Sequence, residues 1–87
     1  MQDLKPIRVF LEVAAQQSFA GAAKSLRMTP ASVTRIVARL ERDLGQQLLV
    51  RTTRQVSLTS AGAIVAARYR PLVEAFDQVG NELDREM

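Results

Sequence analysis

The stretch MTPASVTRIVARLE, residues 28–41, decides the fold, because it joins a helix start signal to two chemically different faces. Thr29 is a good N-cap, and Pro30 suits the first helical position, where its missing N–H donor costs nothing. Gly45 is the expected C-terminal stop, so a helix is predicted over 30–44. At ~100° per residue its apolar residues share one face, which should be buried: Val33, Val37, Leu40 and Leu44. The opposite face is basic.

A second, shorter helix is predicted directly before this one. FAGAAKSL, residues 19–26, is rich in small residues that let another helix cross closely, and Ser18 is its expected N-cap. Residues 27–29 then form a tight turn. Two helices joined in this way, the second amphipathic and basic outside, predict a helix-turn-helix over about 19–38. In that motif the second helix lies in the major groove of DNA and presents its N-terminal half to the bases.

Two further elements flank this motif. Apolar residues at helical spacing predict a first helix over about 3–16. After residue 46 the period changes to that of strands, over about 48–51 and 55–58, with a turn at 52–54. A hairpin in this place is a wing, whose arginines would reach the DNA backbone or an adjacent minor groove.

The last predicted helix, residues 60–87, follows the cap Thr59 and carries a heptad seam. Its apolar residues alternate at spacings of four and three: Val65, Tyr69, Leu72, Phe76, Val79 and Leu83. We predict that this seam is a dimer interface; the alternative is that it folds back onto its own chain as core. Pro71 lies inside the helix and should kink it. The fold class is therefore mainly α, with a winged helix-turn-helix domain over 1–59 and a linker or dimerisation helix over 60–87.

Composition removes several classes of function. At 87 residues one compact domain is expected, and the absence of Cys and His removes disulfides, thiolate zinc sites and the commonest general base. We expect no cofactor and no metal, and an enzyme is a remote alternative because no nucleophile and base pair is apparent. No apolar run approaches the ~18 residues that span a membrane, and no signal peptide is recognisable, so a cytoplasmic protein without a membrane partner is expected.

Charge is unevenly distributed along the chain. The net charge of +3 combines a balanced segment 1–23, a segment 24–70 with a net +7 and a segment 71–87 with a net −4. A basic middle before an acidic end is typical of a polyanion-binding surface followed by an element that does not touch the polyanion. The alternative is an ordinary scatter of solvated surface charge.

Three stretches together resemble a known family: SFAGAAKSL (18–26), MTPASVTRIVARLERDLG (28–45) and LLVRTTRQVSLTSAG (48–62). The chain resembles the N-terminal winged helix-turn-helix domain and linker helix of LysR-type transcriptional regulators. The resemblance covers almost the whole chain, and RTTRQVSLTSAG is its most specific part. It implies a bacterial, sequence-specific activator or repressor. It also implies a C-terminal domain that binds a small-molecule inducer, which these residues do not encode, so we expect no ligand switch in them.

The predicted partners are double-stranded DNA and a second copy of the chain. Arginine can donate to guanine in a bidentate manner, serine and threonine are permissive donors and acceptors, and alanine permits close approach. The residues expected to contact DNA are Ser18, Thr29, Pro30, Ala31, Ser32, Thr34, Arg35, Arg39, Arg51, Thr53 and Arg54.

Each of these signals has a simpler interpretation when it is taken alone. Exposed arginines on a helix are more often solvated charge, and charge near a wing can protect a strand edge. Two alternatives therefore stay open at this point. One is a winged-helix regulator of another family, and the other is a helical interaction module that binds a partner protein through the seam over 65–83.

Overall fold

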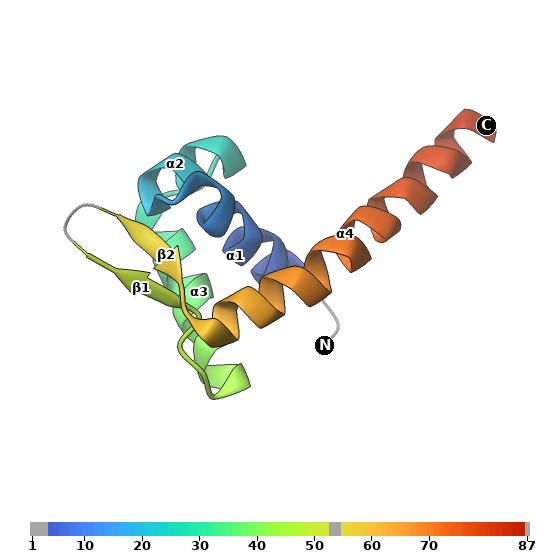
Figure 1. The fold of residues 1–87 in the computed structure, drawn as a ribbon. Helices are drawn as coiled ribbons and strands as arrows, with labels where there is room; N and C mark the ends of the chain where they lie inside the picture. The colour runs from blue at the N-terminus through green and yellow to red at the C-terminus, as the bar shows by residue number, and fades with distance from the viewer. Residues whose placement is uncertain (1–3, 53–54, 87) are drawn as a thin grey trace.

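The computed structural model describes residues 4–52 and 55–86, which form a small helical domain with a projecting helix (Figure 1). The elements in chain order are α1 (Lys5–Gln16), α2 (Phe19–Leu26), α3 (Pro30–Leu44), β1 (Leu49–Arg51), β2 (Val56–Leu58) and α4 (Ser60–Glu86). Helices α1, α2 and α3 pack on one another, the two strands form a hairpin beside them, and α4 leaves the domain as an arm. The predicted mainly α, winged helix-turn-helix fold is confirmed.

The helix boundaries follow from local capping chemistry. Ser18 Oγ accepts a hydrogen bond from the Gly21 N–H at 2.9 Å, and this cap starts α2. Thr29 caps α3 with Pro30 directly after it, and Gly45 ends α3 with a left-handed φ of 67°. Arg27 ends α2 in the same left-handed region, at a φ of 58°, although it is not a glycine. The turn of the helix-turn-helix is therefore built on a residue in a less favourable backbone conformation.

The wing is an antiparallel pair in which Leu49 lies opposite Leu58 and Arg51 opposite Val56. Each strand is shorter by one residue than predicted. Leu48 lies just before β1: its N–H donates to the Glu41 side chain, and its carbonyl accepts from the N–H of Thr59, the residue after β2. The predicted turn includes residues 53 and 54, which lie outside the described residues.

The hydrophobic core lies between the three N-terminal helices and the first half of α4. Its fully buried large side chains are Ile7, Val9, Phe10, Val13, Val33 and Leu48. Ala22 and Ala23 are buried where α2 crosses its neighbours, as their small size predicts. The prediction that Leu44 belongs to the core is wrong: 43% of it is exposed, because it is the last residue of α3, where the helix ends before the loop to β1.

Helix α4 is attached to the domain through its first half. Gly62 and Ala66 are buried there, and Val65 and Tyr69 pack partly against the core. The helix is continuous through Pro71 as far as Glu86, so this proline does not end it. Within residues 4–52 and 55–86, no helix has the length and apolar character needed to cross a membrane.

Candidate nucleic-acid interface

The outer face of α3 is basic and contributes nothing to the core. Arg35, Ala38, Arg39 and Arg42 are all exposed on it, and together with Ile36 they line a shallow depression of about 440 Å³. The two alanines at positions 31 and 38 leave the helix backbone accessible. This face therefore offers guanidinium donors around a surface that another molecule can approach closely.

Three side chains at the start of α3 form a hydrogen-bonded group. Thr29 Oγ1 accepts from the Ser32 N–H at 3.1 Å and lies 2.9 Å from Ser32 Oγ, to which it donates. Arg35 Nη2 also donates to Ser32 Oγ, at 3.2 Å. The Ser32 hydroxyl accepts both bonds, so its own proton remains able to donate outward. One end of the exposed Arg35 guanidinium is thus tied to the first turn of α3.

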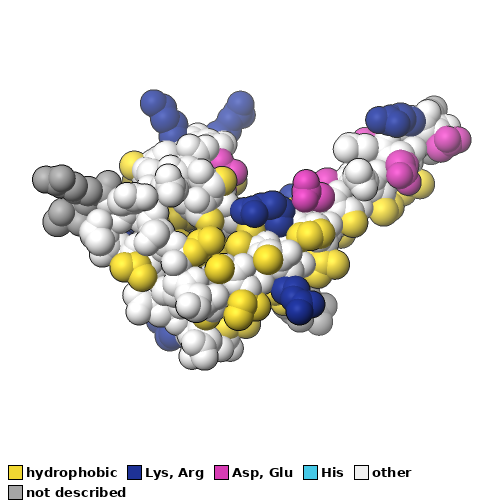
Figure 2. Space-filling view, viewed as in Figure 1, with side chains coloured by type: hydrophobic (Ala, Val, Ile, Leu, Met, Phe, Trp, Pro, Cys, Tyr) yellow, Lys and Arg dark blue, Asp and Glu magenta, His cyan; other side chains and the backbone are white. Residues whose placement is uncertain are grey.

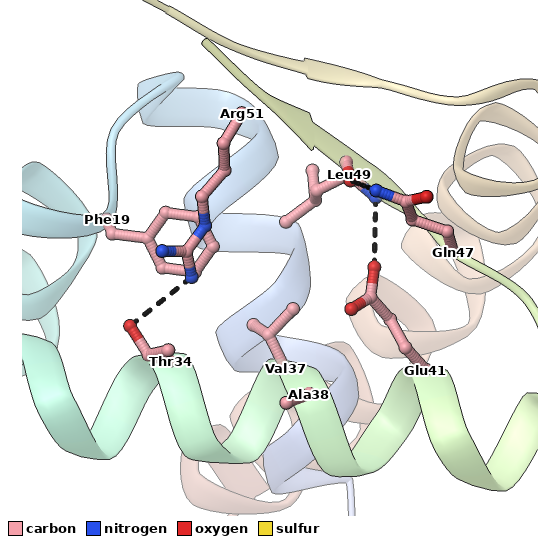
Figure 3. A pocket seen from close by; sticks show the side chains of 8 residues that line it. All are labelled: Phe19, Thr34, Val37, Ala38, Glu41, Gln47, Leu49 and Arg51. Atoms are coloured by element: carbon pink, nitrogen blue, oxygen red, sulfur yellow. Dashed lines mark hydrogen bonds between the residues drawn. The ribbon is translucent and has the colours of Figure 1, made fainter. Parts of the chain in front are cut away.

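The wing touches the helix-turn-helix through Arg51. Its guanidinium carbon lies 3.6 Å from the centroid of the Phe19 ring, and its Nη2 donates to Thr34 Oγ1 at 3.4 Å. Figure 3 shows the guanidinium lying over the ring with one edge turned to α3. One arginine therefore joins the first residue of α2, the N-terminal half of α3 and the end of β1.

Glu41 fixes the start of the wing against α3. Its Oε2 accepts the N–H groups of Leu48 and Leu49, at 2.7 and 3.2 Å. The Gln47 side chain donates to the Leu49 carbonyl at 3.0 Å. Glu41, Gln47 and Leu49 line one cavity of about 240 Å³ between α3 and β1, together with the Arg51 group (Figure 3). The wing is consequently held to α3 at two places.

The structure brings most of the predicted DNA-binding residues to one side of the domain. Thr29, Pro30, Ala31, Ser32, Thr34, Arg35 and Arg39 lie along α3 and its cap, and Arg51 joins them from the wing. Ser18 caps α2 beside Phe19, so its side-chain oxygen already has a backbone donor. Thr53 and Arg54 lie outside the described residues.

The predicted dimer residues divide into two groups. Val65 and Tyr69 are half-buried against the domain's own core. The others are more than half exposed: Leu72 61%, Phe76 62%, Val79 56% and Leu83 61%. In Figure 2 hydrophobic side chains gather along one edge of the projecting helix and continue onto the domain below it. In the described structure the second half of the seam does not fold back as core.

Sequence reasoning missed three residues with organising contacts: Phe19 and Glu41 at this surface, and Asp77 on α4. Asp77 accepts two hydrogen bonds from Arg8, at 2.6 and 3.0 Å, and so ties α4 to α1. These contacts join residues far apart in the chain, and no local pattern signals them. The one hint in the sequence is that Phe19 is one of four aromatic residues in the chain and directly follows a cap.

The comparison with known families decides the identity of this fold. The sequence profile described as "Bacterial regulatory helix-turn-helix protein, lysR family" matches residues 4–63, from α1 through the wing to the first turn of α4. The chain belongs to the LysR family. The resemblance found in the sequence is thereby confirmed, and the alternative of another winged-helix family is removed.

Relatives of this LysR-family chain are named as transcriptional regulators. The activator IlvY of Salmonella typhimurium LT2 is 35% identical over 92 aligned residues, which cover 98% of this chain and 31% of IlvY. The regulator CrgA of Neisseria meningitidis serogroup C is 42% identical over 77 residues, which cover 88% of this chain and 26% of CrgA. The chain thus spans about a third or less of the length of these curated relatives.

Two solved LysR-type DNA-binding domains are similar over their full extent. The BenM domain, determined in complex with the catB site 1 DNA, has a TM-score of 0.89 and 32% identity, covering 97% of this chain and 94% of that one. The CbnR domain in its DNA complex has a TM-score of 0.85 and 30% identity, covering 98% of each chain. The LysR-family chain described here is thus a winged helix-turn-helix DNA-binding domain in fold, with the arm included in the similarity.

Proposed function

We propose that this chain is the DNA-reading part of a bacterial transcriptional regulator and binds, as a homodimer, a duplex site with imperfect two-fold symmetry. The observation that carries the proposal is the outer face of α3, where three arginines and two alanines are exposed without any role in the core. Further support comes from the similar BenM and CbnR domains, which were determined with DNA bound. No enzymatic activity is proposed, and the protein would act in the cytoplasm, where bacterial DNA lies.

In this proposal α3 enters the major groove with its N-terminal half toward the bases. Ala31, Ser32, Thr34 and Arg35 would read base edges, with Arg35 donating to guanine. Thr29 and Pro30 place a helix N-terminus near a phosphate, where the helix dipole favours negative charge. The remaining candidates, Ser18, Arg39, Arg51, Thr53 and Arg54, would contact the backbone or, from the wing, an adjacent minor groove.

The second copy would dock on the arm. Exposed apolar side chains at Leu72, Phe76, Val79 and Leu83 are costly to leave in water and form one seam. Pairing of two arms would place two copies of α3 on successive turns of one duplex face. Regulation by a small-molecule inducer, as the family resemblance implies, is assigned to regions outside residues 1–87.

Selection from a random duplex library at near-physiological salt, followed by sequencing, tests this function. A two-fold symmetric motif is the expected result, and its half-site spacing reports the arrangement of the two arms. Recovery of a single half-site would support the reading of bases by α3 but would contradict binding as a dimer. Tight binding at low salt without any enrichment would reject sequence-specific binding and leave attraction by charge alone.

Two matched double variants distinguish the effect of the basic face of α3 on DNA binding from the effect of total charge. The double variant Arg35→Ala, Arg39→Ala removes two charges from α3, and Arg70→Ala, Arg85→Ala removes two from exposed positions on α4. Only the first pair should abolish enrichment of the selected site. Equal DNA affinity of the α3 variant and the unmodified chain would favour the helical interaction module instead.

A further inference from the structure

Phe19 has a contact that the DNA-reading role of α3 does not explain. It is the first residue of α2 and only half-buried, yet its ring lies close to the Arg51 guanidinium, whose carbon is 3.6 Å from the ring centroid. We propose that Phe19 is a positioning residue that holds Arg51 flat at the junction of α2, α3 and the wing, ready to bind a backbone phosphate of DNA. This inference rests on the proposed function and adds a residue and a ligand group to it.

The stack restricts Arg51 without using its donors. A guanidinium has five N–H donors in one plane, and an aromatic ring covers a face of that plane rather than its edge. Thr34 Oγ1 accepts from one terminal nitrogen at 3.4 Å, which also fixes the rotation of the plane. Other N–H groups therefore keep their edge positions for a phosphate, whose oxygens match this fork. Less side-chain freedom is lost on binding, because Arg51 is already ordered.

The surroundings of Arg51 favour a phosphate over a base. Its guanidinium lies over the Phe19 ring and turns one edge to Thr34 on α3 (Figure 3), whereas Arg35 and Arg39 line a different depression on that helix, which Arg51 does not line. A helix in the major groove has the DNA backbone passing along its flank. Glu41 lines the same cavity, but its Oε2 accepts two backbone N–H groups at the start of β1. Arg51 thus presents a positive charge where the backbone would pass.

A double-mutant cycle distinguishes this role from simple packing of the Phe19 ring. Affinity for a fluorescent mixed-sequence duplex is measured for the unmodified chain, Phe19→Leu, Arg51→Ala and the double variant. Phe19→Leu should weaken binding roughly two- to five-fold when Arg51 is present, as expected for removal of an exposed cation–π pair, and should have no effect in the Arg51→Ala background. Equal losses in both backgrounds would mean that the ring only packs the fold, and would overturn the inference.

Salt dependence gives a readout that packing alone does not move. Arg51→Ala should lower the slope of log affinity against log salt by about 0.9, the value expected when the protein neutralises one phosphate fewer. Phe19→Leu retains the charge, so its slope should stay near that of the unmodified chain while its affinity falls. An unchanged slope in Arg51→Ala would show that Arg51 touches no phosphate and would overturn the inference.

Two conservative variants keep the test informative if Phe19→Leu does not fold. Phe19→Tyr retains the ring and should bind DNA like the unmodified chain. Arg51→Lys retains the charge but loses the planar fork that lies flat on the ring and matches a phosphate, and should weaken binding roughly two- to five-fold. Full affinity in Arg51→Lys would overturn the inference. Failure of the unmodified chain to bind any duplex would overturn the proposed function together with it, whereas DNA binding with additive losses rejects the role of Phe19 alone.

Discussion

At the scale of single residues, Gly62 has the least room for a side chain among the four glycines. A Cβ at this position would lie 2.0 Å from the backbone carbonyl oxygen of Leu48, a distance that no rotamer adjustment can relieve. Three hydrogen bonds fix the same place: Thr59 donates to the carbonyls of Leu48 and Gln47 and accepts from the Gly62 N–H. The start of α4 is therefore pressed directly onto the loop before the wing.

We expect Gly62→Ala to lower the free energy of unfolding by about 2 kcal/mol or more, because backbone must move to admit the methyl group. Urea denaturation followed by circular dichroism at fixed protein concentration measures it. Gly80→Ala is the matched control in the same helix: nothing lies within 4 Å of its Cβ position, and alanine should stabilise an exposed helix interior by about 0.5–1 kcal/mol. Changes of the same sign at both positions would contradict this account.

Arg35 is a second single residue whose proposed role can be tested by substitution. If it donates to a guanine, Arg35→Ala should cost about 1–3 kcal/mol on the selected site and clearly less on a mixed-sequence duplex. Fluorescence anisotropy on both duplexes at one salt concentration measures the difference. Arg85→Ala, which removes the same charge near the end of α4, should leave the ratio between the two duplexes unchanged. Equal losses on both duplexes for Arg35→Ala would reassign Arg35 to a phosphate.

At the scale of elements, the direction in which α4 leaves the domain is set by a contact with α1. Arg8 donates to both carboxylate oxygens of Asp77 and lies 5.8 Å from the centroid of the Phe76 ring. The hydrogen bond from Arg8 is the main reason that the pKa of Asp77 is lowered from its ordinary value of 3.8. Both side chains are partly exposed, so the pair orients the arm more than it stabilises the fold.

The pH dependence of this contact has a definite sign. Because the pKa of Asp77 is lower in the folded chain than in the unfolded one, the pair stabilises the fold above the ordinary value of 3.8 and loses this effect as pH falls through the lowered pKa. Asp77→Asn should therefore reduce the urea midpoint at pH 7, and the difference from the unmodified chain should shrink in acid. Asp84→Asn, on the exposed end of α4, should show no such difference. A pH-independent difference for Asp77→Asn would contradict the ion pair.

The sequence predicts the boundaries of the helices better than it predicts the contacts between them. The boundaries of α2 and α3 are predictable because Ser18, Thr29 and Gly45 act within one helical turn. The contacts of Phe19 and Asp77 are not predictable in this way, because they join residues distant in the chain and depend on how whole helices cross. Periodicity in the sequence thus predicts which residues share a helix face. It does not predict the distant residues that contact and orient them, because those contacts depend on the tertiary structure.

At the scale of the whole molecule, a compact body carries an arm, and the principal extents are 47 × 25 × 20 Å. The two parts have different roles in the proposed function. The buried residues form one cluster that joins the body to the first half of α4. The arm leaves apolar side chains in solvent over its second half (Figure 2), and no other element among residues 4–52 and 55–86 covers them. In the proposed function, dimerisation therefore depends on the half of α4 that follows Val73, its last residue in the buried core.

Val79→Asp tests this division directly. Val79 is 56% exposed and lies in the middle of the exposed seam, so a charge there should prevent pairing of two arms while the body stays folded. Phe76 is less suitable, because its ring also lies near Arg8. Analytical ultracentrifugation should show a monomer, and affinity for a duplex with two half-sites should fall on the order of 100-fold, to the value for a single half-site. Gln78→Asp adds the same side chain at a neighbouring exposed position outside the seam and should preserve the dimer. A dimeric Val79→Asp chain with full affinity would move the interface away from the arm.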